Sequence, residues 1–316
     1  MTTPGSGYLS CRDDGKALLL QPQARFRHTA DAPLVDAALA GRWHLESGVL
    51  LEGQLQTGNG RARPTMVEIT TIEGMPPDEY RAKAVPFAEL TSIDPDERFR
   101  LETEPEILEP RVIELMAPIG KGQRCLIVAP PKAGKTRLLQ QLAHAIAVNH
   151  PETRIFVLLV DERPEEVTDW RRSIIQGEVF ASSSDESVAS HIEISEMLLE
   201  RARRLVELGE DVVVFMDSLT RMSRAYNNNQ KSSGRIMSGG IDARTMEKPR
   251  RVFGSARKAA STSSIEGESP CCRSSRTRSR GCARVSASTR SRNARRTWSP
   301  ISTASRRAAR SWTLAS

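Results

Sequence analysis

The stretch "IVAPPKAGKTRLL", residues 127–139, decides the fold class of this chain. An apolar run leads into a loop of small residues, then Gly134-Lys135-Thr136, and then a sequence with helical periodicity. Backbone N–H groups of such a loop surround phosphate oxygens at the start of the helix, where the helix dipole favours negative charge. In this strand–loop–helix context the pattern predicts a phosphate-binding P-loop, although Ala129 stands where the strict pattern has Gly.

Strands and helices alternate around this loop. The expected helices are residues 136–150 and 193–209. The expected strands, whose central residues are apolar, are residues 124–130, 154–162 and 211–218. Strands of this kind that alternate with helices predict a parallel sheet buried on both faces. Residues 111–258 are therefore expected to form an α/β nucleotide-binding domain.

The preceding part of the chain has a different hydrophobic pattern. Short alternating or apolar runs are separated by turn-rich sequences such as "RDDGK" and "TGNGRARP", and "DAPLVDAALAGRW" favours a short helix. Strands at this spacing predict a small β-barrel over residues 1–86. The sequence that follows is rich in Pro and Asp, beginning with "GMPPDEYRAKAVPF", and favours a linker. The linker is assigned to residues 87–110.

The net charge of +7 is unevenly distributed along the 316 residues. Residues 259–316 contribute +10, which leaves −3 for residues 1–258, so the high isoelectric point is no argument that the folded part binds nucleic acid. Cys11 and Cys125 lack metal-ligand spacing, and the sequence predicts structural thiols. An apolar run of membrane-spanning length and a signal-peptide layout are both missing, which predicts a cytoplasmic protein without membrane contact.

Three side chains of the predicted domain suit ATP and Mg²⁺. Lys135 would neutralise the β- and γ-phosphates, and the Thr136 hydroxyl would hold Mg²⁺. Asp217 ends an apolar strand, where its carboxylate would support the same ion or, in the alternative, cap a turn.

Glu162 follows another strand and is the candidate that orients and deprotonates the attacking water. Arg163 is placed to reach the nucleotide. From these residues alone, a solvated acidic loop is an equally good interpretation.

Together with "GKGQRCLIVAPPKAGKT" and "RAYNNNQKSSGRIMSGGIDARTMEKPRRVFGSARK", these stretches resemble the Rho family of bacterial transcription termination factors from about Ala117 to Lys258. The family consists of homohexameric, ATP-driven RNA translocases and helicases with a RecA-like motor domain. The resemblance implies single-stranded RNA and the RNA polymerase elongation complex as partners. It implies catalytic roles for Glu162, Lys135 and Arg163, and a metal role for Thr136 and Asp217. It implies nucleotide contacts by Gly120, Lys121, Gly122, Gln123, Arg124, Cys125, Lys132, Ala133, Gly134, Lys135, Thr136, Arg137 and Arg163.

Two RNA sites follow from the same resemblance. The loop "NNNQKSSGRIMSGG" is similar to the one that grips RNA in the ring channel, which implies contacts by Lys231, Ser232, Ser233, Gly234 and Arg235. Its small residues and cations suit a phosphate backbone, while a mobile surface loop is the alternative. The barrel resembles the family's oligonucleotide-binding (OB-like) barrel. Its candidate base-stacking residues are Tyr8, Phe26 and Trp43, and burial in the barrel is the alternative for each.

The sequence after Lys258 departs from the family, in which a strand, an RNA loop and an arginine for the neighbouring subunit's ATP site should follow. Instead, Arg and Ser make up 27 of the last 58 residues. If the reading frame is shifted back by one base, the codons of Ser269–Cys282 can encode an apolar strand. In the same frame, the codons of Arg296–Ala309 can encode an Arg-rich stretch close to the family's. We expect residues 259–316 to be a disordered basic tail, produced by a frameshift between Lys258 and Ser269 or, alternatively, a genuine RNA-binding tail.

The predicted architecture is thus an OB-like barrel, an incomplete RecA-like P-loop ATPase domain and a disordered tail. The predicted function is a Rho-type RNA-dependent ATPase, impaired by the loss of its last motor elements. A non-enzymatic RNA-binding remnant is the alternative. A third class, a rotary ATP synthase subunit, fits the barrel and the "SSGRIMSGG" loop less well.

Overall fold

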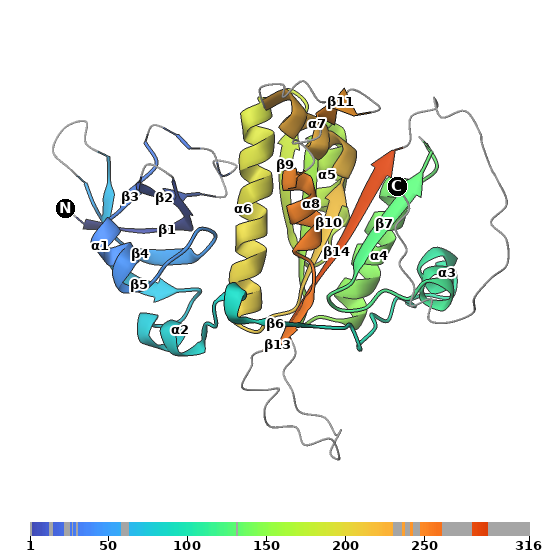
Figure 1. The fold of residues 1–316 in the computed structure, drawn as a ribbon, viewed down its shortest axis with the longest axis horizontal. Helices are drawn as coiled ribbons and strands as arrows, with labels where there is room; N and C mark the ends of the chain where they lie inside the picture. The colour runs from blue at the N-terminus through green and yellow to red at the C-terminus, as the bar shows by residue number, and fades with distance from the viewer. Residues whose placement is uncertain are drawn as a thin grey trace, which may run out of the picture.

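The computed structural model of the chain describes residues 2–12, 15–21, 26, 28–29, 31–57, 63–130, 132–229, 236–237, 241–242, 247–260 and 280–289. A small β-barrel lies against one side of an α/β domain, and the long helix α6 (Val188–Glu207) stands between them (Figure 1). Within the described residues, no helix is long and apolar enough to cross a membrane.

The N-terminal part forms the expected barrel. Its strands are β1 (Thr2–Cys11), β2 (Ala17–Leu20), β3 (Leu34–Val35), β4 (Leu50–Gln56) and β5 (Thr65–Ile72), closed in the order β1-β2-β3-β5-β4. Apolar side chains such as Leu9, Leu51 and Met66 are fully buried in it. The helix expected in "DAPLVDAALAGRW" is shorter than that stretch, because the chain first forms β3 and then α1 (Ala37–Arg42), whose first turn is capped by the Asp36 side chain.

The stretch expected to be linker contains regular structure. Helix α2 (Pro77–Lys83) begins with a proline at its first turn, carries Asp78 and Glu79 there, and buries Tyr80. Pro and acidic residues stabilise the first turn of a helix, so the residues that suggested a linker are the ones that start α2. Beyond it, the short helix η2 (Phe87–Glu89) leads to strand β6 (Thr91–Ile93), which pairs with β13 (Lys258–Ala260).

The α/β domain is built on the predicted parallel sheet. Its parallel strands lie in the order β7-β14-β10-β8-β9. Their bounds are β7 (Arg124–Ala129), β8 (Arg154–Glu162), β9 (Glu178–Ser183), β10 (Val212–Asp217) and β14 (Arg280–Thr289). The helices are α3 (Leu108–Met116), α4 (Lys135–Asn149), α5 (Pro164–Ser173), α6, α7 (Leu219–Asn229) and α8 (Glu247–Gly254). A separate short pair joins β11 (Ile236–Met237) to β12 (Ile241–Asp242).

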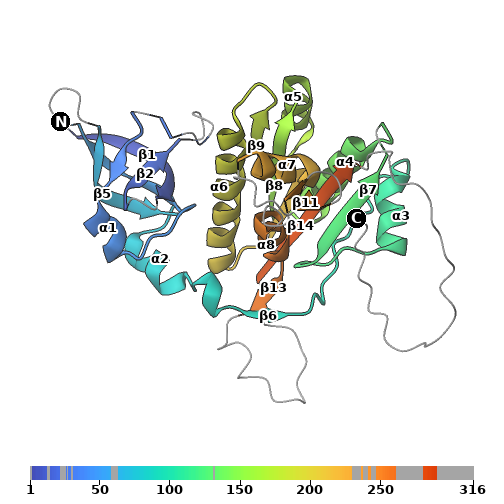
Figure 2. The ribbon, with the colours of Figure 1, turned by 45° about the horizontal axis from the view of Figure 1, so that its top comes forward.

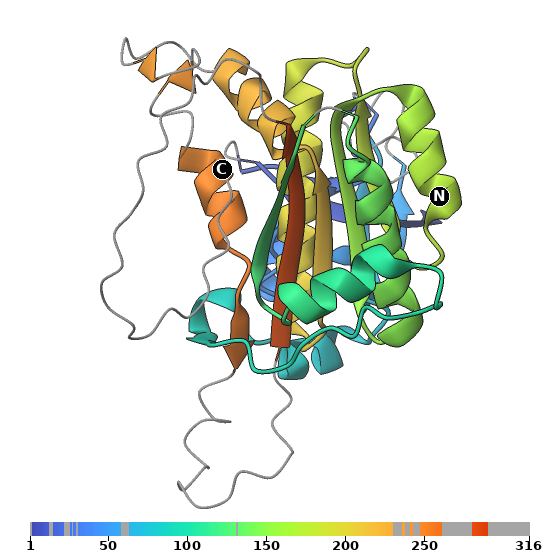
Figure 3. The same ribbon diagram turned by 90° about the vertical axis from the view of Figure 1, so that its right-hand side faces the viewer.

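Both faces of the sheet are covered, as the unbroken apolar strands predict. On β8, Phe156 and Leu158 belong to the core that packs on α6, whereas Val157 and Leu159 belong to the core that packs on α4. Successive side chains of a strand point to opposite faces, so each strand contributes to both cores. Figures 2 and 3 show the two layers of helices on either side of the strands.

The prediction that residues 259–316 form a disordered tail is wrong for two segments. Residues 258–260 form β13, and residues 280–289 form β14, which pairs in parallel with β10 on one side and β7 on the other. Without β14, the facing edges of β7 and β10 would lack backbone hydrogen-bond partners, which is costly in a buried sheet. Ten residues without proline satisfy both edges, whatever the composition of the surrounding tail. Residues 261–279 and 290–316 lie outside the described residues.

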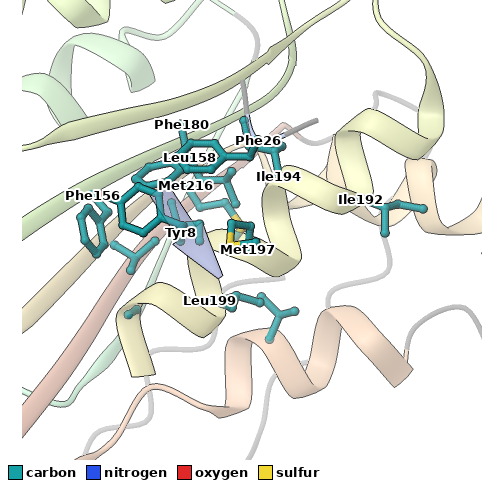
Figure 4. Packing of buried hydrophobic residues seen from close by; sticks show 14 of the residues in the cluster. Tyr8, Phe26, Phe156, Leu158, Phe180, Ile192, Ile194, Met197, Leu199 and Met216 are labelled. Carbon is teal, nitrogen blue, oxygen red and sulfur yellow. The ribbon is translucent and has the colours of Figure 1, made fainter. Parts of the chain in front are cut away.

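The barrel is joined to the α/β domain by an aromatic cluster (Figure 4). Phe26 stacks on Phe180 of β9 at 4.9 Å between ring centroids, and Tyr8 lies 5.4 Å from Phe26. Arg201 of α6 lies over the Tyr8 ring and forms a buried ion pair with Glu73 at the end of β5. A buried ion pair inside an apolar seam favours one relative orientation of the two parts.

Candidate functional site

The predicted P-loop and two predicted site residues meet at the carboxyl edge of the parallel sheet. The P-loop follows β7, Asp217 is the last residue of β10, and Glu162 is the last residue of β8. Because these strands are parallel, their carboxyl ends lie at one edge, which is where open α/β sheets bind ligands.

The P-loop contains two residues in left-handed backbone conformations, which are common in anion-binding loops. Lys132 and Gly134 both adopt left-handed conformations, with φ of 64° and 81°. A Cβ added at Gly134 would meet nothing within 4 Å, so the space in front of the start of α4 is open. The first turn of α4 has no side-chain cap, which leaves its N–H groups for an anion.

Lys135, Thr136 and Asp217 form one polar group below this loop. Lys135 Nζ lies 2.8 Å from Asp217 Oδ1, and the Thr136 hydroxyl donates to Asp217 Oδ2 at 3.1 Å. Asp217 is 2% exposed, and its Oδ1 has no hydrogen-bond partner of good geometry despite the nearby ammonium group. A buried carboxylate of this kind stabilises a cation beside it.

Glu162 is directed by an irregularity at the end of its strand. The β8–β9 register shifts between Val160 and Glu162, and Asp161 has φ of 57°. Arg221 of α7 donates to the Asp161 carbonyl oxygen and approaches Glu162 Oε2 at 3.2 Å. Sequence reasoning did not single out Arg221; its spacing of four residues from Asp217 in "DSLTR" is the signal that could have found it, since α7 begins directly after the strand.

The environment of Glu162 favours its protonated form. Burial, then a hydrogen bond with Glu166, raises the pKa of Glu162 to about 8, against the opposing effect of Arg221. Its Oε2 atom is buried and has the Arg221 guanidinium as its ion-pair partner. A carboxyl group whose pKa lies near the ambient pH is suited to exchange a proton with an attacking water.

These residues fit Mg²⁺. The hydroxyl of Thr136 and the carboxylate of Asp217 are hard oxygen donors of the type this ion prefers. Among the described residues, no group of three or more His, Cys, Asp or Glu side chains would hold a metal by itself. The site therefore suits an ion that takes its remaining ligands from water and phosphate.

The structure distributes the other predicted nucleotide contacts over two places. Lys132, Ala133 and Arg137 are exposed on the P-loop and α4, and Arg163 is exposed directly after Glu162. The segment Gly120–Cys125 instead lies at the start of β7, the opposite edge of the sheet. There Lys121 pairs with three carboxylates. Contacts from this segment to the nucleotide remain a prediction that rests on the resemblance alone.

Among the described residues, the predicted RNA contacts Tyr8, Phe26 and Trp43 do not form one exposed surface. Tyr8 is 6% exposed and Phe26 is 7% exposed, and both rings pack in the seam described above. Trp43 ends α1, is half-buried and lies beneath the Arg42 guanidinium. Lys231, Ser232, Ser233, Gly234 and Arg235 lie outside the described residues. Tyr8 and Phe26 are buried, but against the α/β domain and not inside the barrel, so neither an exposed stacking surface nor the expected alternative describes them.

The fold and the site define a P-loop nucleotide-binding protein. Residues 110–241 match the nucleotide-binding domain of the ATP synthase alpha/beta family. Transcription termination factor Rho of Streptomyces coelicolor is 49% identical over 264 residues, 82% of this chain and 60% of that protein. Rho of Chromobacterium violaceum is 42% identical over 265 residues, 83% of this chain and 63% of that protein.

These matches confirm the resemblance found in the sequence: the chain is a relative of transcription termination factor Rho. It spans 60% and 63% of the length of these two relatives. Among solved structures, an ATPase from the type III secretion system of pathogenic bacteria covers 76% of this chain with 17% identity and a TM-score of 0.48, too distant to add to the sequence matches.

Proposed function

We propose that the chain is a Rho-type ATPase that couples ATP hydrolysis in the cytoplasm to movement along single-stranded RNA during transcription termination. The observation that carries this proposal is the convergence of the P-loop, Asp217 and Glu162 at one edge of a sheet whose sequence matches Rho. The closed barrel is proposed to be the OB-like module of that protein. The homohexameric ring and the encounter with RNA polymerase are proposed from the family.

The side chains divide the work as follows. The P-loop N–H groups and Lys135 bind and orient the phosphates, and Thr136 with Asp217 holds Mg²⁺, which supplies charge neutralisation when bound. Glu162 orients a water and takes its proton, and Arg221 keeps the Glu162 backbone and carboxylate in place. Arg163, exposed beside Glu162, is proposed to contact the nucleotide.

The arginine that a neighbouring subunit should contribute is not recognisable after Lys258 in the printed frame. In related NTPases such an arginine accelerates turnover by roughly 1,000-fold or more. We therefore propose that the chain binds MgATP but turns it over slowly. The frameshift remains the proposed origin of the tail.

The test is ATP turnover by the purified chain with and without a pyrimidine-rich single-stranded RNA. Glu162→Gln serves as a control that keeps MgATP binding and removes the proton acceptor. RNA-stimulated turnover that disappears in Glu162→Gln supports the proposed ATPase, and fast turnover contradicts the proposed impairment. RNA binding without any nucleotide binding would favour the non-enzymatic remnant.

A further inference from the structure

The backbone that carries Glu162 has to be held in an unusual conformation. Asp161 lies in the left-handed region with φ of 57°, and the register with β9 shifts between Val160 and Glu162. A bulge of this kind redirects the side chain that follows it, and it persists only when the surroundings fix it. Arg221 fixes it from the side of α7.

The end of β9 fixes the bulge from the other side. Ser183 stands opposite Glu162 in the β8–β9 pairing, and the Ser184 N–H donates to the Glu162 carbonyl oxygen at 2.9 Å. Figure 2 shows β9 beside β8 at this end of the sheet, with α6 next to β9. The position of Glu162 therefore depends on where the last residues of β9 lie.

A single carboxylate gathers the side chains at the end of β9. Glu186 accepts hydrogen bonds from the hydroxyls of Ser182 at 3.2 Å, Ser183 at 3.3 Å and Ser190 at 2.6 Å, and its own N–H donates to the Ser183 carbonyl oxygen at 2.9 Å. Ser190 lies in the first turn of α6, so Glu186 connects that helix to the end of β9.

Burial makes this network costly to disrupt. Ser182 is 0%, Ser183 8% and Ser190 7% exposed, and Ser182 also bonds to the buried ring of His191 at 2.5 Å. A buried hydroxyl that loses its acceptor incurs the cost of an unpaired polar group. Because Ser182 is fully buried, this serine–histidine–carboxylate group offers no surface to a substrate and is not a second hydrolytic site.

We propose that Glu186 is a positioning residue for Glu162: it ties the end of β9 to α6 and thereby holds the bulge that aims the catalytic carboxylate. The proposal rests on the proposed ATPase function for its catalytic consequence. The mechanical part, the link from Glu186 through Ser183 and Ser184 to Glu162, is independent of turnover.

The experiment compares Glu186→Ala and Glu186→Gln with the matched control Glu193→Ala on α6, whose carboxylate makes none of these hydrogen bonds. The first measurement is amide hydrogen exchange resolved at Ser184, with Val213 and Phe215 of β10 as internal references. Loss of one or two net hydrogen bonds predicts about 10-fold faster exchange at Ser184 in Glu186→Ala, with the references unchanged. Glu186→Gln, which keeps one acceptor oxygen, should restore part of the protection.

The second measurement is the split between kcat and KM for ATP. Displacement of Glu162 predicts a kcat about 10-fold lower in Glu186→Ala with KM unchanged, and partial recovery in Glu186→Gln. Unchanged exchange at Ser184, or an equal rise in exchange across β10, overturns the proposal. If the wild-type chain shows no turnover, the proposed function fails and the exchange result alone decides whether Glu186 holds the bulge.

Discussion

Two lysines of similar burial lie at opposite edges of the same sheet and have opposite surroundings. Lys121, at the amino edge, is 7% exposed and lies 2.8 Å from Glu97, 3.2 Å from Glu152 and 2.8 Å from Asp211. Lys135, at the carboxyl edge, is 13% exposed and has Asp217 as its ion-pair partner among the described residues. The difference separates a cation whose charge is already satisfied from one that still has room for an anion.

The environment of Lys121 is that of a structural residue. Burial by itself would lower the pKa of Lys121, but its hydrogen bonds to Asp211 and Glu97 outweigh burial and raise that pKa above its ordinary value. The three carboxylates come from the segment before α3 and from the starts of β8 and β10. Lys121 thus joins that segment to the sheet, and it would have to leave these partners to reach a phosphate.

The largest expected effect is at the open lysine. Lys135→Ala removes a charged hydrogen-bond donor to phosphate, which predicts a fall in MgATP affinity of about 100-fold, with thermal stability close to that of the wild type. Titration with a fluorescent ATP analogue measures the affinity, and differential scanning calorimetry measures the stability. Lys135→Ala with unaltered ATP affinity would remove the distinction between the two lysines.

Lys121→Ala should show the reverse pattern. The substitution leaves three carboxylates facing one another, one of them largely buried, and predicts a loss of about 2 kcal/mol in the free energy of unfolding with little change in MgATP affinity. Urea unfolding gives the stability, and Lys83→Ala, at an exposed lysine of α2, is the control with an expected change below about 0.5 kcal/mol. A strong fall in ATP affinity without destabilisation would instead support the nucleotide contact implied by the family resemblance.

Glu162, at the same edge as Lys135, makes the stability of the folded chain depend on pH. The ordinary pKa of this side chain is 4.5, and in the folded chain the pKa of Glu162 lies near 8. Burial raises the pKa most, Glu166 and Asp217 raise it further, and Arg221 opposes the rise. Between these values the folded chain holds a proton that the unfolded chain releases, so stability falls as the pH rises from about 4.5 to about 8. Glu162→Gln stays neutral and should flatten this fall, with a relative gain of more than about 1 kcal/mol above pH 8. Nucleotide-free urea unfolding at pH 5, 7 and 9 tests this, and parallel curves for both proteins contradict it.

Much of this contrast could be predicted from the sequence, and the part that could not has a physical reason. The P-loop pattern around Lys135 and the apolar strands that end at Asp217 and Glu162 predicted the carboxyl edge, because strand periodicity and the P-loop pattern are local signals. The partners of Lys121 come from three segments between 24 and 90 residues away, and no local pattern connects them. β14 was missed for a related reason: its place in the sheet is set by backbone pairing with β7 and β10, not by its own composition.

The smallest expected effect divides the Lys121 cluster itself. Glu152 is 54% exposed and lies at 3.2 Å, whereas Asp211 is 16% exposed and lies at 2.8 Å. Exposed ion pairs contribute little and shielded ones more, so Glu152→Gln should cost less than about 0.5 kcal/mol and Asp211→Asn about 1 kcal/mol or more. Urea unfolding of both variants at low and at 1 M salt checks the order, since only the exposed pair should be strongly screened. Equal costs would mean that the combined charge of the three carboxylates holds Lys121, and not the shielded carboxylate of Asp211 alone.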